Sequence, residues 1–321
     1  MRILITGATG FIGRHLFLKL KKTGYEVEGL SLEKGVIDGK KMIVLDLQNK
    51  NKLRHLLKGK MFDVIIHLAA KIPQSINSQD AKNSLKENFQ TTFNLLEEFN
   101  KTKTKKFIYA SSMSVVGSPE YLPVDEKHPV NPDNFYSVGK LLGEILCERF
   151  KAQTKKNITI LRISAPYGPG QNENCVIPLF IRRALASRNI LIYGTGKRTQ
   201  DFIYTADVTN AFLAAIRHNC PGIYNIGSGE STSTLDLAKI ILKNIKHTTS
   251  NIVLSGREDP QENYKMEVDI SKAKRNLKFL PKVFIDDGIK KYINYFINQK
   301  NENWHNFRYS FQSLWPEGGF S

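Results

Sequence analysis

Three glycines spaced three residues apart constrain the fold of this chain more than any other feature. The segment TGATGFIG (6–13) directly follows the first apolar run and opens a pattern with helical periodicity. Gly7 permits a tight turn, Gly10 lets the backbone approach a pyrophosphate, and Gly13 permits close packing of a helix on a strand. The helix N-terminus adds backbone N–H groups and a positive dipole. The segment therefore predicts a dinucleotide-binding strand–turn–helix at the start of the chain.

Short apolar runs alternate with helical patterns through the first half of the chain. This alternation predicts an α/β fold of the Rossmann type, with a doubly wound parallel sheet. Runs such as VIIHLAA are apolar almost throughout, as expected for strands that are buried on both faces. The predicted strands are 2–6, 26–30, 42–45, 63–67, 107–111 and 158–163, and the predicted helices are 11–22, 52–57, 80–100 and 135–152.

The pattern changes after about residue 165, where the loops become longer and richer in glycine and proline. Helices are predicted there at 177–187, 206–217, 235–245 and 286–297. We expect an NAD(P)-binding Rossmann domain over 1–165, to which later segments return, and a smaller C-terminal α/β substrate-binding lobe over 166–297. An aromatic-rich extension, 298–321, contains Trp304 and Trp315. A disordered tail is usually poor in aromatic residues, so we expect the extension to pack on the body or on a neighbouring subunit.

The charge of the chain is strongly basic, with 47 Lys and Arg against 30 Asp and Glu and a formal net charge of +17. Most of the basic residues are lysines, and no basic stripe is interleaved with aromatic residues. A sequence-reading nucleic-acid protein would be expected to show both arginine and such a stripe, so no nucleic-acid partner is predicted. The basic runs 101–106 and 151–156 are expected to be solvated helix ends and loops.

Cys147, Cys175 and Cys220 stand far apart, without the spacing of a disulfide framework or a zinc site. No metal is therefore predicted, and the pattern fits a reducing compartment. The first residues have neither the apolar core nor the cleavage site of a signal peptide. No apolar run approaches the length of a membrane span. We expect a cytoplasmic protein with no membrane association.

Tyr136 and Lys140 form a Tyr-x-x-x-Lys pair at the start of a predicted helix, where the spacing places both side chains on one face. A nearby ammonium would lower the pKa of Tyr136 and let it act as an acid and base near neutral pH. Ser111 and Ser112 end a predicted strand, at the edge of the sheet where ligands bind in such folds. Strand-end capping is the alternative role for these serines. The glycine loop, the serines and the Tyr–Lys pair together favour catalysis.

Ser31 stands at the end of the second predicted strand, where an acidic residue would bond the ribose 2′-hydroxyl of NAD. The missing carboxylate removes repulsion against a 2′-phosphate, but no arginine follows to bind one; Glu33 and Lys34 are the nearby charges. The residues therefore leave the choice between NAD and NADP open.

These motifs together resemble the extended short-chain dehydrogenase/reductase superfamily, in its nucleotide-sugar epimerase/dehydratase branch, and most nearly the UDP-glucose 4-epimerases. The resemblance covers roughly residues 1–297. It rests on TGATGFIG (6–13), LDL (45–47), HLAA (67–70), Asn88 in ENFQTTFNLLE, SSMSVVG (111–117), YSVGK (136–140), YGPGQ (167–171), DFIYTADV (201–208) and SKAKRNLKFLP (271–281).

The resemblance implies NAD as the cofactor, with NADP possible, and a nucleotide-diphosphate sugar as the substrate. It implies that Tyr136 is the acid and base, that Lys140 tunes it and binds the nicotinamide ribose, and that Ser112 is its partner at the substrate. The implied cofactor contacts are Gly7, Gly10, Phe11, Ile12, Gly13, Ser31, Asp46, Leu47, Leu68, Ala69, Ala70, Asn88, Ser111, Tyr136 and Lys140. The implied substrate contacts are Lys71, Ser112, Asn174, Val176, Tyr193, Gln200 and Arg257. A homodimer through 80–100 and 135–152 is also implied.

Departures from the family pattern bear on the reaction. Met113-Ser114 replaces the Asp-Glu pair that 4,6-dehydratases carry after the catalytic Ser/Thr, which disfavours dehydration. Ala165 and Gln200 replace an expected Asn and Arg at the diphosphate, where Lys197 or Arg198 could substitute. We therefore predict an NAD(P)-dependent nucleotide-sugar epimerase that acts by hydride transfer at sugar C4 through a 4-keto intermediate. The alternatives are an NAD(P)H-dependent nucleotide-4-keto-6-deoxysugar reductase and a non-catalytic dinucleotide-binding regulator.

Overall fold

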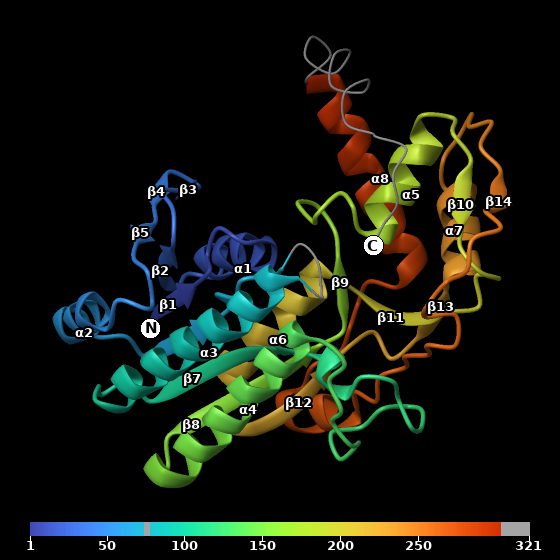
Figure 1. Ribbon diagram of the computed structural model, residues 1–321. Coiled ribbons are helices and arrows are strands. Elements are labelled where there is room, and N and C mark those ends of the chain that lie inside the picture. The colour runs from blue at the N-terminus through green and yellow to red at the C-terminus, as the bar shows by residue number, and fades with distance from the viewer. Residues whose placement is uncertain (74–77, 303–321) are drawn as a thin grey trace. The chain divides into compact units, whose positions relative to one another are not determined.

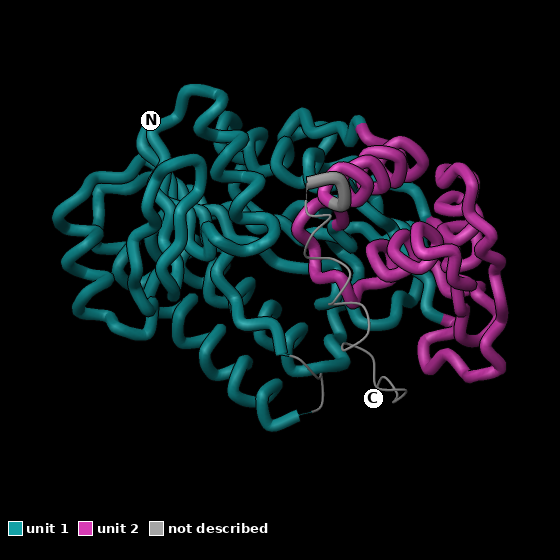
Figure 2. Tube along the Cα trace, turned by 90° about the horizontal axis from the view of Figure 1, so that it is seen from above, with its two compact units in different colours: residues 1–166, 200–231, 264–282 teal, residues 167–199, 232–263, 283–321 magenta. Residues whose placement is uncertain are grey.

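The structure, a computed structural model, describes residues 1–73 and 78–302 and separates into two compact units. Unit 1 comprises residues 1–166, 200–231 and 264–282, and unit 2 comprises residues 167–199, 232–263 and the chain from 283 onward. Figure 2 colours unit 1 teal and unit 2 magenta. The chain therefore leaves unit 1 after residue 166 and returns to it twice. The assignment of cofactor binding to one part and substrate binding to the other stays a prediction.

A seven-stranded sheet forms the centre of unit 1, in the order β12-β8-β7-β6-β1-β2-β5. Its strands pair in parallel throughout. From β1 the chain builds outward first through β2 and β5 and then through β6, β7, β8 and β12, so the strand order reverses beside β1. This arrangement confirms the predicted doubly wound parallel sheet. The strands are β1 (Arg2–Thr6), β2 (Glu26–Ser31), β5 (Ile43–Val44), β6 (Val64–His67), β7 (Lys106–Ser112), β8 (Asn157–Ile163) and β12 (Gly222–Ile226).

Helices cover both faces of this sheet (Figure 1). Alternate residues of the strands enter two separate apolar clusters, because successive side chains point to opposite faces. In β1, for example, Ile3 and Ile5 join the cluster with α1 and α6, and Leu4 joins the cluster with α2, α3 and α4. The five helices are α1 (Phe11–Lys22), α2 (Lys50–Gly59), α3 (Gln79–Asn100), α4 (Phe135–Thr154) and α6 (Thr205–Arg217).

Polar caps define the ends of the long helices. Ser78 accepts a hydrogen bond from the Ala81 amide at the start of α3, and Asn134 accepts one from Ser137 at the start of α4. The C-terminal carbonyls of two helices receive a lysine ammonium. Lys106 donates to the carbonyls of Ala215, Ile216 and His218 at the end of α6, and Lys156 donates to those of Phe99, Asn100 and Thr102 at the end of α3.

These contacts change the interpretation of the two basic runs, which we expected to be solvated. Lys106 and Lys156 are half-buried, and their ammonium groups complete helix ends. Burial lowers the pKa of both lysines. The cation at each C-terminus also complements the helix dipole. Part of the basic excess therefore has a structural purpose that composition could not reveal.

Shorter elements complete unit 1. The strands β3 (Val36–Ile37) and β4 (Lys40–Lys41) form a β-hairpin. The short helix η1 (Met113–Val116) follows β7, and η2 (Ala273–Leu277) is a π-helical turn. A parallel bridge joins Val124 to Val268. This bridge lies in a third apolar cluster that includes Met113, Val115 and Val116 of η1. The segment after β7 is thus anchored on the late segment 264–282.

The described part of unit 2 contains three helices and a two-stranded parallel sheet, β10-β14. Its elements are α5 (Val176–Leu185), β10 (Ile190–Ile192), α7 (Thr234–Lys243), β14 (Ile252–Leu254) and α8 (Ile285–Glu302). The strands β9 (Ala165–Tyr167), β11 (Thr199–Tyr204) and β13 (Ser231–Ser233) form a further sheet in the order β13-β11-β9, where the chain passes between the units. Helix α8 continues to Glu302, past the predicted end at 297. The aromatic extension from residue 303 lies outside the described residues.

Candidate active site

The glycine loop between β1 and α1 is built by close backbone contacts. Gly7 has φ +70°, and a Cβ on it would stand 2.7 Å from the Ala69 nitrogen. A Cβ on Gly13 would stand 2.1 Å from the Gly7 carbonyl oxygen. The Ala8 amide donates to the Leu30 carbonyl at 3.1 Å, which ties the loop to β2. Both glycines are therefore required by the packing of the chain on itself.

Gly10 differs from Gly7 and Gly13, because the space around it is open. Among the described residues only the Gly7 carbonyl oxygen comes within 4 Å of a Cβ placed on Gly10, at 3.3 Å. Gly10 is also the N-cap of α1, whose first turn contains no acidic residue and whose N-terminus has no side-chain cap in the described chain. An exposed helix N-terminus with free N–H groups suits a phosphate. The loop therefore fits the diphosphate of a dinucleotide.

The two side chains that follow Gly10 pack on the protein. Phe11 is half-buried and meets the ring of His15 edge-on, with centroids 5.8 Å apart. Ile12 is half-buried and packs against the apolar cluster under α1. Their backbone amides belong to the first turn of α1. Any contact of these residues with a cofactor would therefore come mainly from the backbone.

A buried polar chain lies beneath the ends of β1 and β6. The Thr6 hydroxyl is 2.7 Å from His67 Nδ1, and His67 Nε2 is 3.0 Å from the Thr92 hydroxyl of α3. Burial lowers the pKa of His67 to about 3, so the imidazole stays neutral at physiological pH. The same Thr6 hydroxyl accepts from the Ala69 amide at 3.3 Å. In the sequence, His67 stands out only as part of the HLAA motif, because its partners are distant along the chain.

Residues 68–71 continue from β6 past the glycine loop. Leu68, Ala69 and Ala70, predicted to line the cofactor path, are half-buried. The side chain of Asn88 binds the backbone of Lys71 on both sides. It accepts a hydrogen bond from the Lys71 amide at 2.7 Å and donates one to the Lys71 carbonyl at 2.9 Å. Asn88 was predicted as a cofactor contact, and the structure shows that its amide positions this backbone. Lys71 itself pairs with Asp80 and Glu87, each at 3.1 Å.

The predicted adenine-side residues lie after β2 and β5. Ser31 ends β2 and is buried, and its hydroxyl donates to the Glu33 carbonyl at 2.6 Å. Asp46 is exposed and caps a turn by accepting from the Gln48 amide at 2.8 Å. Leu47 is buried in the cluster under α2 and α3. Of these three side chains, only the Asp46 carboxylate is exposed.

Tyr136 and Lys140 lie one turn apart at the start of α4. Lys140 is buried, and its ammonium donates to the Ala110 carbonyl of β7 at 2.8 Å. The same ammonium lies 5.8 Å from the centre of the Tyr136 ring and 5.3 Å from that of Tyr109. The helix packs against β7 and η1, which carry the predicted serines. The structure therefore brings Tyr136, Lys140 and the end of β7 together.

The pKa values at this pair differ from the sequence expectation. Burial raises the pKa of Tyr136 to about 12, although the tyrosine keeps part of its surface exposed. Burial also lowers the pKa of Lys140 to about 8, and the Glu144 carboxylate opposes that shift. The expected lowering of the Tyr136 pKa by Lys140 is therefore wrong for the protein alone. Desolvation dominates, and the ammonium is directed at the Ala110 carbonyl.

The two predicted serines have different surroundings. Ser112 is half-buried and caps η1 by accepting from the Ser114 amide at 3.2 Å, so its hydroxyl hydrogen can be donated elsewhere. Ser111 is buried, and its hydroxyl donates to Glu144 at 2.5 Å. A cofactor contact by Ser111 stays a prediction, and its side chain is already committed to Glu144.

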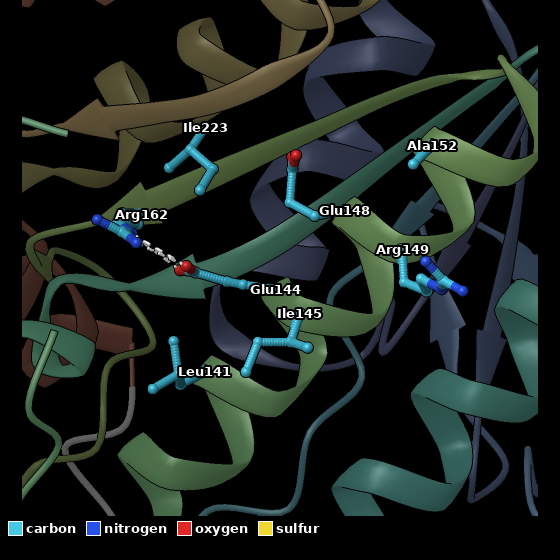
Figure 3. Close-up of a pocket in the computed structure, with 8 residues that line it drawn as sticks. All are labelled: Leu141, Glu144, Ile145, Glu148, Arg149, Ala152, Arg162 and Ile223. Carbon is cyan, nitrogen blue, oxygen red and sulfur yellow. Dashed lines mark hydrogen bonds and ion pairs between the residues drawn. The ribbon is translucent and has the colours of Figure 1, made fainter. Parts of the chain in front are cut away.

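Glu144 and Arg162 form a buried ion pair that sequence analysis missed. The Arg162 Nη2 to Glu144 Oε2 distance is 2.7 Å, and Nε lies 3.0 Å from Oε1. Figure 3 shows this pair beside a surface pocket of about 480 Å³ between α4, β8 and β12. The only available signal was a Glu four residues after Lys140. The partner on β8 could not be identified without the fold.

Unit 2 brings two of the predicted substrate residues together. The Arg257 guanidinium lies 5.9 Å from the centre of the Tyr193 ring, and the Gly194 amide donates to the Arg257 carbonyl at 2.8 Å. Arg257 is exposed and has no ion pair in the described chain. Asn174 is exposed just before α5, and Val176 opens that helix. Gln200 differs from these residues because it lies on the part of β11 that belongs to unit 1.

The described residues offer neither a metal cluster nor a membrane-spanning helix. No group of three or more His, Cys, Asp or Glu side chains in residues 1–73 and 78–302 is arranged to hold a metal ion. None of the described helices is long and apolar enough to cross a membrane. Cys147, Cys175 and Cys220 are free thiols.

A profile of the NAD dependent epimerase/dehydratase family matches residues 3–227. The chain is 35% identical over 310 residues to a Methanocaldococcus jannaschii protein provisionally assigned as a UDP-glucose 4-epimerase, covering 94% of this chain and 99% of that protein. It is 30% identical over 334 residues to the Bos taurus dTDP-D-glucose 4,6-dehydratase, covering 98% and 93%.

Among solved structures, the chain resembles the UDP-glucuronic acid 4-epimerase from Bacillus cereus in complex with UDP-glucuronic acid and NAD. The TM-score is 0.81 at 31% sequence identity, over 93% of this chain and 100% of that one.

Proposed function

The chain belongs to the NAD-dependent epimerase/dehydratase family, and from this premise we propose that it epimerises a UDP-linked sugar at C4 with NAD as its cofactor. The observation that carries the proposal is the Tyr136–Lys140 pair on α4, with the Lys140 ammonium held on the Ala110 carbonyl. A regulator that only binds a dinucleotide would have no use for a half-buried tyrosine above a buried lysine ammonium. The nucleotide-sugar class follows from the relatives across nearly the whole chain.

Several residues of unit 1 would hold the cofactor. The open backbone at Gly10 and the N-terminus of α1 would receive the diphosphate. The exposed Asp46 carboxylate would contact the adenine end, and the half-buried segment 68–70 would line the path between them. When bound, NAD would supply a hydride acceptor at the sugar carbon and a positive charge near the phenol.

Tyr136 would remove the proton from the sugar hydroxyl and later return one. Its pKa of about 12 means that the phenol is protonated in the protein alone at neutral pH. Lys140, charged below its pKa of about 8, would stabilise the phenolate once it forms. Ser112, whose oxygen accepts from the Ser114 amide, would donate its hydroxyl hydrogen to the same sugar oxygen. Each role is a hydrogen bond or a proton transfer at a named atom.

The substrate end would use exposed residues of unit 2. Arg257 is the group best suited to a diphosphate, because its guanidinium has no ion pair among the described residues. The Tyr193 ring beside it offers an apolar face. Asn174 is exposed just before α5, and Val176, the first residue of that helix, is half-buried. Lys71 would contribute less, because two carboxylates already hold its ammonium.

The family also includes dehydratases, and one of them is 30% identical to this chain. A 4,6-dehydratase needs carboxyl groups to eliminate water, and Met113 and Ser114 stand at that position here. Both residues lie in η1, directly after Ser112. We therefore propose epimerisation in preference to dehydration.

The experiment is incubation of the purified protein with UDP-glucose, UDP-N-acetylglucosamine, UDP-glucuronic acid and dTDP-glucose, each with NAD, followed by NMR of the products. The expected result is a C4 epimer of at least one UDP-sugar, with the 6-position unchanged. A 4-keto-6-deoxy product would identify a dehydratase and overturn the proposal. Loss of the epimer in the Tyr136→Phe variant would assign the reaction to this site.

A further inference from the structure

Three buried side chains connect the catalytic helix to the two strands beneath it. Ser111 at the end of β7 and Arg162 on β8 both bind Glu144 on α4, as Figure 3 shows for the Arg162–Glu144 pair. Ser111, Glu144 and Arg162 are 4%, 2% and 4% exposed. Every contact is a hydrogen bond to a carboxylate, and three of them come from one guanidinium. We call this set the Glu144 network.

The network lies one helical turn after Lys140 on α4. Residues four apart on a helix occupy the same face, so Glu144 and Lys140 both face the sheet. Lys140 is held on the Ala110 carbonyl, and Glu144 is held on Ser111, the next residue of β7. Two adjacent positions of the strand therefore anchor two successive turns of the helix.

The energetics of burial indicate that stability alone does not require such a pair. Replacing a buried ion pair by well-packed neutral residues is often neutral or stabilising, although removing one partner is strongly destabilising. In this structure the carboxylate also acts on Lys140, because its charge favours the ammonium that burial disfavours. The network therefore has an effect on the Tyr136–Lys140 pair that a neutral core would not provide.

We propose that Glu144, held by Arg162 and Ser111, is a positioning residue that keeps Lys140 charged and in place beneath Tyr136 during the reaction. The claim that Glu144 supports turnover rests on the proposed function. The claim that Glu144 keeps Lys140 charged concerns Lys140 alone and can be tested without a substrate. Glu144 contacts neither substrate nor cofactor in this account, and it acts through Lys140.

Other titratable groups around Lys140 come from the elements packed against it. Tyr136 and Glu144 lie on α4, and Tyr109 lies on β7. His67 on β6 senses the Lys140 charge and is neutral at physiological pH, because burial lowers its pKa to about 3. Burial raises the pKa of both tyrosines, which keeps them uncharged as well. Glu144 is therefore the charged partner that favours the Lys140 ammonium, and the Arg162 guanidinium that it binds is the charge of opposite sign in the network.

The test uses the double variant Glu144→Gln/Arg162→Met in the full chain. Removing both charges avoids the unpaired buried charge that the single Glu144→Gln variant would leave, so the double variant is the one expected to fold. The Gln retains an acceptor for Ser111. Glu148→Gln is the matched control, because Glu148 lies on the same helix and pairs with Lys151 at the surface. Circular dichroism and thermal melting establish that each variant is folded.

Two readouts separate positioning from structure. The titration of Lys140, followed by NMR of 15N-labelled lysine and assigned with Lys140→Met, should move to lower pH by on the order of one unit in the double variant. Turnover of the preferred UDP-sugar should fall about tenfold in kcat at pH 7.5, with KM changed much less. The Glu148→Gln control should show neither change.

An unchanged Lys140 titration in the folded double variant would overturn the inference, whatever the activity. If the pKa of Lys140 falls in the double variant but kcat keeps its wild-type value, the claim that Glu144 supports turnover is overturned. If the wild-type protein converts no UDP-sugar, the proposed function fails, and the Lys140 titration alone decides whether Glu144 holds the charge of Lys140.

Discussion

The candidate residues of unit 1 and those of unit 2 differ in how firmly the protein holds them. In unit 1, Gly13 packs against the Gly7 carbonyl, and Lys140 is buried with its ammonium on the Ala110 carbonyl. In unit 2, Arg257 is exposed and touches only the face of the Tyr193 ring among the contacts described for its guanidinium. On the proposed function, unit 1 would supply a preorganised reaction centre and unit 2 an adjustable grip on the substrate. Changes in unit 1 should then affect folding and kcat, and changes in unit 2 should affect KM.

The largest effect is expected from Gly13→Ala. The new Cβ would stand 2.1 Å from the Gly7 carbonyl oxygen, so the backbone of the loop has to move. We expect a loss of more than about 4 kcal/mol in the free energy of unfolding, or no folded protein, with no measurable NAD binding. Gly59→Ala in α2 is the control, since no atom of the described residues lies within 4 Å of its Cβ. Thermal melting that is equal for the two variants would contradict the tight packing.

The next largest effect is expected from Tyr136→Phe, which removes the acid and base and leaves the ring. We expect kcat to fall about 10³-fold, within the range of general acid–base catalysis, with the Kd for NAD unchanged within about twofold. Steady-state kinetics and NADH fluorescence measure the two quantities. Substantial turnover in the variant would show that another group transfers the proton.

The pH dependence of kcat/KM should report Lys140. The pKa of Lys140 is lowered to about 8, so the ammonium is present below that pH and is lost above it. The pKa of Tyr136 is about 12, so the phenolate fraction rises tenfold per pH unit, and kcat/KM should rise with pH up to about pH 8 and level off above it, where the loss of the ammonium offsets the gain. In Lys140→Arg, whose side chain stays charged, kcat/KM should keep rising above pH 8 even if it is lower at every pH. A wild-type kcat/KM that keeps rising to pH 10 would show that the charge of Lys140 is not needed.

A smaller effect is expected from Arg257→Met in unit 2. Losing one charge-assisted contact to a diphosphate should raise KM for the UDP-sugar about tenfold and leave kcat nearly unchanged. Arg188→Met is the control, because Arg188 is an exposed arginine of the same unit that is not among the candidate residues. A drop in kcat that exceeds the rise in KM would remove the distinction between the two units.

The smallest effect is expected from Lys71→Met. Lys71 lies in unit 1 but is exposed, and Asp80 and Glu87 hold its ammonium. Exposed pairs of this kind contribute about 0–1 kcal/mol, so we expect KM to change less than about threefold and the melting temperature hardly at all. A larger rise in KM would show that Lys71 exchanges its carboxylates for the substrate.

The same contrast explains how far the sequence could be interpreted. The helix 11–22 and the strand 2–6 were predicted with their observed ends, because the glycines, the apolar run and the helical period coincide there. The strand β12 (Gly222–Ile226) was not among the predicted strands of the main sheet. It pairs with β8 across a separation of more than 50 residues, and no local signal marks such a partner.

The candidate site residues also differ in how far the sequence predicts them. Tyr136 and Lys140 follow from spacing on one helix, but the sign of the Tyr136 pKa shift depends on burial, which spacing does not contain. The Glu144–Arg162 pair and the Thr6–His67–Thr92 chain join different elements of the sheet. No local motif in the sequence marks these residues as partners. Such contacts become visible only when the register of the strands is known.

The most direct test of the account follows deuterium placed at C4 of the preferred UDP-sugar. If the protein is a C4 epimerase, the label stays at C4 of the epimerised product, because the hydride that leaves C4 returns to the same carbon. Mass spectrometry and NMR of the product show where the label is. Label recovered at C6, as in a dehydratase, or released from the sugar without a C4 epimer, would contradict the account.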